Sequence, residues 1–234
     1  MTQMLASVTS TAEALLALEL GADIIDLKNP DDGALGALPL ETIQDIVKAI
    51  DGRRVVSATI GDPSDDISLV MRKITAVAAT GIDIVKIGIA TSRAQLASWQ
   101  GMAWEPISTR LVAVLFADQP PDFDFLDMLA DQAFYGVMLD TADKSHGGLR
   151  SHFDTNEIQA FVDRTHRLKL VCGLAGSLKR DDIVPLLRLN PDYLGFRGAL
   201  CHQNSRTASI DVEAFTAIRS RISLGTASEC HYLR

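Results

Sequence analysis

The stretch ADIIDLKNPDDGALGALP, residues 22–39, joins a short apolar run to two charged side chains and a loop rich in glycine and proline. Side chains alternate between the two faces of a β-strand, so Asp26 and Lys28 are predicted to point the same way. Burying a charge at the end of a hydrophobic strand is costly unless the group has a partner or a chemical task. The stretch alone leaves two interpretations open: a structural ion pair, or an amine beside a proton-transfer group in a catalytic cleft.

Short apolar runs like this one recur along the chain and alternate with helical patterns. The predicted strands are Leu5–Val8, Asp23–Asp26, Arg54–Thr59, Ile84–Ile87, Leu111–Leu115, Gly136–Leu139, Lys169–Cys172 and Tyr193–Phe196. The predicted helices are Ser10–Gly21, opened by a Ser10/Glu13 capping box, then Ile43–Ile50, Ile67–Thr80, Thr91–Trp99, Phe125–Gln132, Asn156–Thr165, Asp181–Leu187 and a last one capped by Asp211. A long polar loop is expected over Asp140–Asp154.

The order of these elements predicts the fold. Strictly alternating β and α segments imply a parallel sheet, and eight such units imply a single-domain (β/α)8 TIM barrel. The alternative is an open doubly wound sheet, which usually has fewer strands and a glycine-rich turn after the first strand. Val8-Thr-Ser-Thr11 stands there instead, and this favours the barrel. We expect the barrel to span residues 1–222 and residues 223–234 to form a disordered tail.

The composition narrows the possible partners and location. The chain has 234 residues, 47% of them hydrophobic, and a net charge of −8. An acidic chain argues against nucleic acid or an anionic membrane surface as the main partner. No apolar run approaches the roughly 20 residues that cross a bilayer, and no signal peptide is recognisable. We therefore expect a cytoplasmic protein, assembled as a homo-oligomer, that acts on a small molecule.

Polar residues gather where the predicted strands end, which is where TIM barrels place their active sites. They are Asp26 and Lys28 after the second strand, Lys86 on the fourth, Asp140 at the end of the sixth, and Lys144 in the next loop. One ion pair would explain two of these groups, but not three lysines and two carboxylates on one rim. Neighbouring ammonium groups and desolvation favour the free amine form of a lysine, which attacks carbonyl groups. The predicted chemistry is imine formation followed by carbanion or enamine steps, with aspartates moving protons.

The seventh and eighth strands end in glycine-containing segments, at the place where TIM barrels commonly bind phosphate. The candidate phosphate-binding residues are Gly173, Ala175, Gly176 and Ser177 on one segment and Arg197, Gly198 and Ala199 on the other. Glycines at strand ends are also ordinary turn residues, but both of the expected strands carry them. Basic groups concentrated at this rim of an acidic chain fit a phosphorylated carbonyl substrate.

The sequence offers no set of metal ligands. The three cysteines, Cys172, Cys201 and Cys230, show no metal-binding spacing. His146, His152 and His202 fall near the rim without such spacing either, so they are interpreted as solvated loop residues. We expect neither a metal nor a cofactor.

Five segments together resemble a known family. They are DIIDLKNPDDGALGALP (23–39), IVKIG (84–88), GVMLDTADK (136–144), VCGLAGSL (171–178) and DYLGFRGALC (192–201). They are similar to the (5-formylfuran-3-yl)methyl phosphate synthases of methanofuran biosynthesis and its methylotroph counterpart. The resemblance implies a TIM barrel that joins two molecules of glyceraldehyde 3-phosphate, with loss of phosphate and water.

The resemblance also implies roles for individual residues. Lys28 would form the Schiff base, Lys86 would accept a proton, and Asp140 and Lys144 would assist. Two alternatives stay open: a class I aldolase acting on another phosphorylated sugar, and a non-catalytic protein that binds a sugar phosphate.

Overall fold

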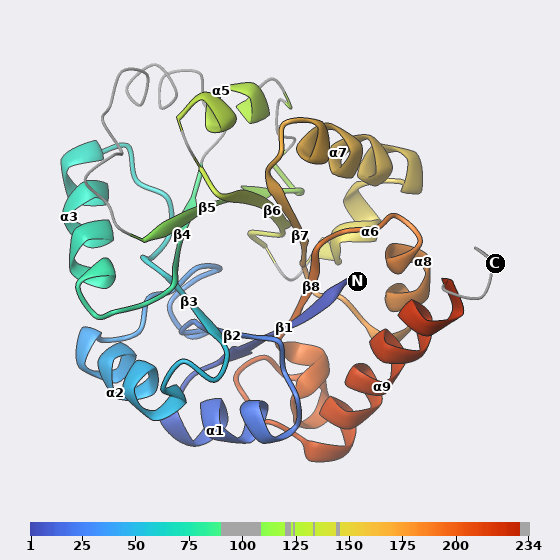
Figure 1. The fold of residues 1–234 in the computed structure, drawn as a ribbon, viewed down its shortest axis with the longest axis horizontal. Helices are drawn as coiled ribbons and strands as arrows, with labels where there is room; N and C mark the ends of the chain where they lie inside the picture. Colours follow the sequence, from blue (N-terminus) through green and yellow to red (C-terminus); the bar gives the residue numbers. More distant parts are fainter. Residues whose placement is uncertain (90–108, 120–122, 124, 133, 144–145, 230–234) are drawn as a thin grey trace.

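The chain forms a ring of strands enclosed by helices (Figure 1). This computed structural model describes residues 1–89, 109–119, 123, 125–132, 134–143 and 146–229. The predicted helix Thr91–Trp99, Lys144 and Cys230 lie outside the described residues.

The strands of the described part close into a parallel barrel in chain order, from β1 to β8 and back to β1. They are β1 Gln3–Val8, β2 Ile24–Leu27, β3 Val55–Thr59, β4 Ile84–Gly88, β5 Arg110–Phe116, β6 Gly136–Asp140, β7 Val171–Leu174 and β8 Tyr193–Phe196. The described helices are α1 Thr11–Glu19, α2 Leu40–Ile50, α3 Ile67–Ala78, α5 Phe125–Asp131, α6 Leu149–His152, α7 Thr155–Arg167, α8 Ile183–Leu187 and α9 Val212–Glu229. The predicted TIM barrel is confirmed.

The first helix illustrates how local sequence fixes an element. Ser10 caps α1 by accepting a hydrogen bond from the amide of Glu13, at 3.2 Å. The Glu13 carboxylate reaches back to the amide of Thr9, at 2.9 Å, one residue earlier than a standard capping box requires. This shift leaves the carboxylate close to the rim of the barrel, where it contacts the end of β8.

Several boundaries differ from the sequence prediction by a few residues, and three of the differences change how a segment is described. The loop expected over Asp140–Asp154 contains the short helix α6. β7 starts at Val171 because Lys169 adopts a left-handed backbone conformation (φ 60°), which a strand does not accommodate. The last helix, α9, continues to Glu229, beyond the boundary expected at residue 222.

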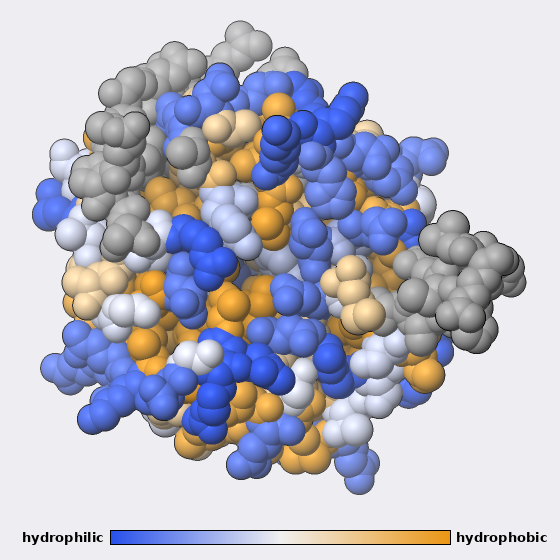
Figure 2. Space-filling model, in the orientation of Figure 1, coloured by the Kyte–Doolittle hydropathy of each residue, from blue (hydrophilic) through white to orange (hydrophobic). Residues whose placement is uncertain are grey.

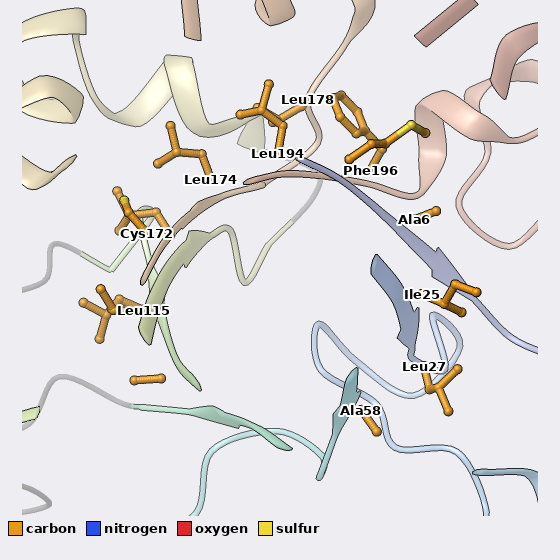
Figure 3. Packing of buried hydrophobic residues seen from close by; sticks show 14 of the residues in the cluster. Ala6, Ile25, Leu27, Ala58, Leu115, Cys172, Leu174, Leu178, Leu194 and Phe196 are labelled. Carbon is orange, nitrogen blue, oxygen red and sulfur yellow. The ribbon is translucent and has the colours of Figure 1, made fainter. Parts of the chain in front are cut away.

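Two groups of buried apolar side chains hold the barrel together. The larger group lies between the strands and the surrounding helices, and Figure 3 shows members such as Ile25, Leu27 and Leu194 on this side of the strands. The smaller group fills the inside of the barrel near the starts of the strands, and includes Leu5, Ile84 and Tyr193. Each fully buried aliphatic side chain contributes about 1.5–3 kcal/mol. The interior group leaves space at the other end of the barrel for polar residues, which lie beside a small third cluster that includes Leu35, Val114 and Phe116.

On the face shown in Figure 2, hydrophobic areas are small and separated by hydrophilic residues. In the part of the chain that the structure describes, no helix combines the length and the apolar character needed to cross a membrane.

Candidate active site

Asp26 lies on the inner face of β2 and is completely buried. Its carboxylate accepts three hydrogen bonds, from Ser7 Oγ at 2.8 Å, Ser57 Oγ at 2.6 Å and Lys86 Nζ at 2.8 Å. Burial alone would raise the pKa of Asp26, but the ammonium groups of Lys86 and Lys28 and the hydrogen bonds from Lys86 and Ser57 lower it. Asp26 is therefore a permanent anion at neutral pH.

The two serines that support Asp26 come from the neighbouring strands. Ser7 of β1 and Ser57 of β3 stand opposite Asp26 in the strand register, one on each side. We did not predict them from the sequence. The available signal was a small polar residue at an inward-facing position of an otherwise apolar strand.

Lys86 is on the inner face of β4 and is 2% exposed. Its side chain reaches across the inside of the barrel, past β3, to the Asp26 carboxylate of β2. Breaking such a buried pair is strongly destabilising, because the remaining charge is left without a partner.

Lys28 follows β2 directly and is 8% exposed. Its Nζ lies 3.5 Å from Oδ2 of Asp140, the last residue of β6. The other oxygen of Asp140 accepts a hydrogen bond from the amide of Thr141, at 2.7 Å. The structure thus brings Asp26, Lys28, Lys86 and Asp140 together, with each lysine beside a different carboxylate.

The loop after Lys28 folds back on itself. The amide of Asn29 donates to the carbonyl of Gly36 at 2.8 Å, and Thr59 Oγ1 donates to the same carbonyl at 2.9 Å. A Cβ atom on Gly36 would come within 2.3 Å of the carbonyl oxygens of Asn29 and Asp32, so only glycine fits.

Two further contacts fix the same loop to the barrel. The amide of Leu35 donates to Asp62 Oδ1 at 2.9 Å, after β3. The Leu35 side chain packs with Val114 and Phe116 of β5 in a small separate cluster. The loop is therefore anchored on two sides of the rim.

A cavity of about 50 Å³ lies inside the opposite end of the barrel. Its walls include the first residues of several strands, such as Gln3, Arg110 and Tyr193, and it reaches Ser57 and Lys86. A volume of this size holds a few water molecules and is too small for a sugar phosphate. The cavity borders Ser57 and Lys86 from the side where the strands begin, and it is not the predicted active site.

The candidate phosphate-binding residues fall into two kinds. Gly173 faces the inside of the barrel, where a Cβ atom would lie 2.2 Å from the Tyr193 ring, so packing explains this glycine. Gly176 and Ser177 lie beyond β7 and have positive φ angles (99° and 49°). Such conformations are typical of a tight turn, in which backbone groups are exposed. Ala175, between them and β7, is buried beside Met138 inside the barrel.

The eighth strand contributes the second group. Gly198 opens a single 3₁₀ turn, Gly198–Leu200, one residue after the end of β8, and this turn includes Ala199. Arg197 precedes it, but its guanidinium points into an ion pair with Glu13 (2.6 Å between Nη1 and Oε2). The side chain of Arg197 is therefore engaged by the protein itself.

No group of three or more histidine, cysteine, aspartate or glutamate side chains suited to a metal occurs among the described residues. His146 and His202 are mostly exposed and pair with Asp143 and Asp211. These contacts are typical of surface loops. Lys144, expected at the rim, lies outside the described residues.

Sequence comparison identifies one family. The profile of the 4-HFC-P synthases matches residues 4–219. A (5-formylfuran-3-yl)methyl phosphate synthase from Methanopyrus kandleri is 32% identical over 216 residues, covering 87% of this chain and 91% of that protein. The corresponding enzyme of Methanosarcina acetivorans is 31% identical over 219 residues, with coverage of 88% and 93%.

Solved structures with the same fold are more distant in sequence. A 3-hexulose-6-phosphate synthase superimposes with a TM-score of 0.67 at 19% identity, covering 94% of this chain and 100% of the other. Phosphoribosyl anthranilate isomerase from Thermus thermophilus gives a TM-score of 0.67 at 15% identity, with coverage of 95% and 99%. At such identities the likeness shows the fold alone.

Proposed function

Since the chain belongs to the 4-HFC-P synthase family, we propose that it makes (5-formylfuran-3-yl)methyl phosphate from two molecules of glyceraldehyde 3-phosphate, through an imine on Lys28. The atoms of two triose phosphates balance against one furan product, one phosphate and two waters. The product would serve the synthesis of methanofuran or a related cofactor.

One observation carries the proposal. Two buried lysines stand at one end of the barrel, and each has its own carboxylate. A single structural ion pair would not explain a second buried lysine with its own carboxylate. It also gives no reason for the 3.5 Å distance between Lys28 Nζ and Asp140 Oδ2. A long contact of this kind is weak, so Lys28 can leave it to react.

Lys28 is the proposed nucleophile and Asp140 its base. Transfer of a proton from Nζ to the Asp140 carboxylate leaves a lone pair on nitrogen, which attacks the aldehyde carbon of the substrate. Asp140 returns this proton to the former carbonyl oxygen and then relays a second proton from the nitrogen of the adduct to the same oxygen, which leaves as water when the imine forms. Asp140 thus acts first as a base and then as an acid.

Lys86 is the proposed carrier of later protons. The imine withdraws electrons from the neighbouring carbon, so the hydrogen on that carbon becomes removable. As an ammonium paired with Asp26, Lys86 can give a proton to a departing phosphate or hydroxyl oxygen of the substrate, and the neutral amine that remains is the acceptor that the family resemblance implies. Asp26 holds this side chain in place and stays ionised throughout.

Phosphate groups would dock on the backbone of Gly176 and Ser177 after β7 and of Gly198 and Ala199 after β8. This placement follows the usual phosphate site of TIM barrels. The resemblance adds Lys144 as an assisting residue.

The test is product analysis with glyceraldehyde 3-phosphate as the sole substrate. We expect a furan aldehyde of the predicted mass and one phosphate released per product. A class I aldolase of another kind would form a sugar phosphate without releasing phosphate, and a non-catalytic binder would leave the triose phosphate unconsumed. Either result would reject the proposal.

A further inference from the structure

Arg197 has no hydrogen-bond donor left for a substrate. Its Nε donates to the carbonyl of Arg206, Nη1 to Ser7 O and Glu13 Oε2, and Nη2 to Glu13 Oε1 and Ala208 O, at 2.6–3.3 Å. A guanidinium has five N–H groups, and these contacts use all of them. The guanidinium of Arg197, beside the expected phosphate position, is thus fully used by contacts within the protein.

Arg206, nine residues later, is engaged differently. Its Nη2 donates to the carbonyls of Pro30 and Gly33, in the loop that follows Lys28. Its Nε and Nη1 donate to no group among the described residues, and none of the ion pairs found there includes it. The half-buried guanidinium therefore keeps three N–H donors and an unpaired positive charge.

The position of Arg206 links the two halves of the proposed site. Its guanidinium contacts the loop that begins at Asn29, directly after the proposed nucleophile. Its backbone amide lies 3.9 Å from the point that a Cβ on Gly198 would occupy, at the end of β8. The side chain thus runs from the strand end where a phosphate is expected toward Lys28.

We propose that Arg206 is a substrate-binding residue that holds the phosphate group of the triose phosphate. This inference rests on the proposed function. The charge of Arg206 is unpaired among the described residues and both N–H groups of its Nη1 are free, so they can donate charge-assisted hydrogen bonds to a phosphate oxygen. Its Nη2 stays on the loop carbonyls, so phosphate binding and the position of the loop over Lys28 are coupled through one side chain.

The test compares trapping of the imine by borohydride with two aldehydes, glyceraldehyde 3-phosphate and glyceraldehyde. In Arg206→Gln we expect the concentration for half-maximal labelling of Lys28 to rise roughly 10- to 100-fold for the phosphorylated aldehyde, as loss of a hydrogen bond to a charged group predicts. For glyceraldehyde it should change little. Arg206→Lys, which keeps the charge but not the fixed set of guanidinium N–H donors, should fall between Arg206→Gln and the wild type.

Asp62→Ala supplies the matched control. Asp62 holds the same loop through the amide of Leu35 but carries a negative charge that phosphate would avoid. A loop that merely loosens should weaken labelling by both aldehydes to the same extent, and this is the result expected of Asp62→Ala. Equal losses for the two aldehydes in Arg206→Gln would overturn the inference.

Calorimetric titration with inorganic phosphate separates this inference from the proposed function. Wild-type protein should bind phosphate, and Arg206→Gln should bind it at least tenfold more weakly. If wild type binds phosphate but makes no furan product, the proposed function fails while the role of Arg206 stands. Equal phosphate affinity in both proteins, or no phosphate binding by the wild type, would reject the role of Arg206.

Discussion

The Nζ atom of Lys86 lies 2.8 Å from Oδ1 of Asp26, although β3 separates the strands that carry them. Lys28, only two residues from Asp26, turns instead to Asp140 on the far side of the barrel. The two lysines therefore have different partners, and we expect them to have different roles in the reaction.

Lys28→Arg and Lys86→Arg should separate the nucleophile from the proton carrier. A guanidinium stays protonated and cannot attack a carbonyl, so Lys28→Arg should abolish both turnover and borohydride labelling. Lys86→Arg should slow turnover by roughly 10²–10⁴-fold, the range of general acid–base groups, and still be labelled at Lys28. Peptide mapping after trapping distinguishes the two. Label on the Lys86 peptide, retained in Lys28→Arg, would exchange their roles.

Asp26→Asn should destabilise the fold by about 3–5 kcal/mol, because it leaves the Lys86 ammonium buried without a counter-charge. The double variant Asp26→Asn/Lys86→Met removes that charge and should recover most of the loss. Urea unfolding of the wild type, both single variants and the double variant measures the coupling. If the losses of the two single variants simply add up in the double variant, the interaction between Asp26 and Lys86 contributes nothing to stability.

The Asp26 carboxylate should also make the unfolding free energy of the barrel depend on pH in the acid range. The folded pKa of Asp26 is below the ordinary 3.8, so between these two values the unfolded chain binds more protons than the folded one. The stabilisation is fully present above pH 3.8 and is lost as the pH falls toward the folded value. The difference in unfolding free energy between wild type and Asp26→Asn should be constant at higher pH and shrink below this point. A difference that begins to fall near neutral pH would contradict it.

The Arg197–Glu13 contact should matter for stability and not for substrate affinity. Glu13→Gln removes the charge from a well-buried pair and should cost about 1.5–3 kcal/mol. Asp127→Asn, at the exposed pair with Arg164, is the control and should cost less than about 1 kcal/mol. Thermal unfolding gives the stabilities, and the KM for triose phosphate should be unchanged in Glu13→Gln. A KM that rises in Glu13→Gln without loss of stability would indicate that Arg197 contacts the substrate.

A chelator should leave turnover unchanged. Amines activate the carbonyl group in the proposed reaction, and the described residues offer no cluster of metal ligands. The measurement is the rate of product formation before and after dialysis against the chelator. Activity that disappears and returns with a divalent ion would contradict the expectation.

The alternation of strand and helix patterns was enough to predict the barrel, and the ends of the predicted strands were enough to place Asp26, Lys28, Lys86 and Asp140 on one rim. It could not predict which lysine pairs with which carboxylate. Lys86 and Asp26 are 60 residues apart, and their contact depends on how the closed ring curves past β3.

Arg197 and Gly173 show a second limit of prediction from the sequence. A glycine or an arginine at a strand end reads the same in the sequence whether it serves a ligand or the packing. Only the Tyr193 ring beside Gly173, and the Glu13 carboxylate 184 residues from Arg197, reveal that these two are occupied by the protein itself. Arg206 was missed because nothing in its local sequence marks it, and its significance lies in donors that stay free.

The junction between β1 and β8 has a consequence for how the chain is made. Gln3 donates to Asp192, Thr2 to Pro191 and Arg219 to Asp23, each across nearly the whole length of the chain. During translation, the first strand therefore leaves the ribosome long before its partner exists, and its edge stays open until the last strand and helix have been synthesised. Ring closure is then a late step that depends on contacts of very high sequence separation, which are slow to form. Truncation before residue 193 would leave a chain with both edge strands exposed, ready to pair with other copies.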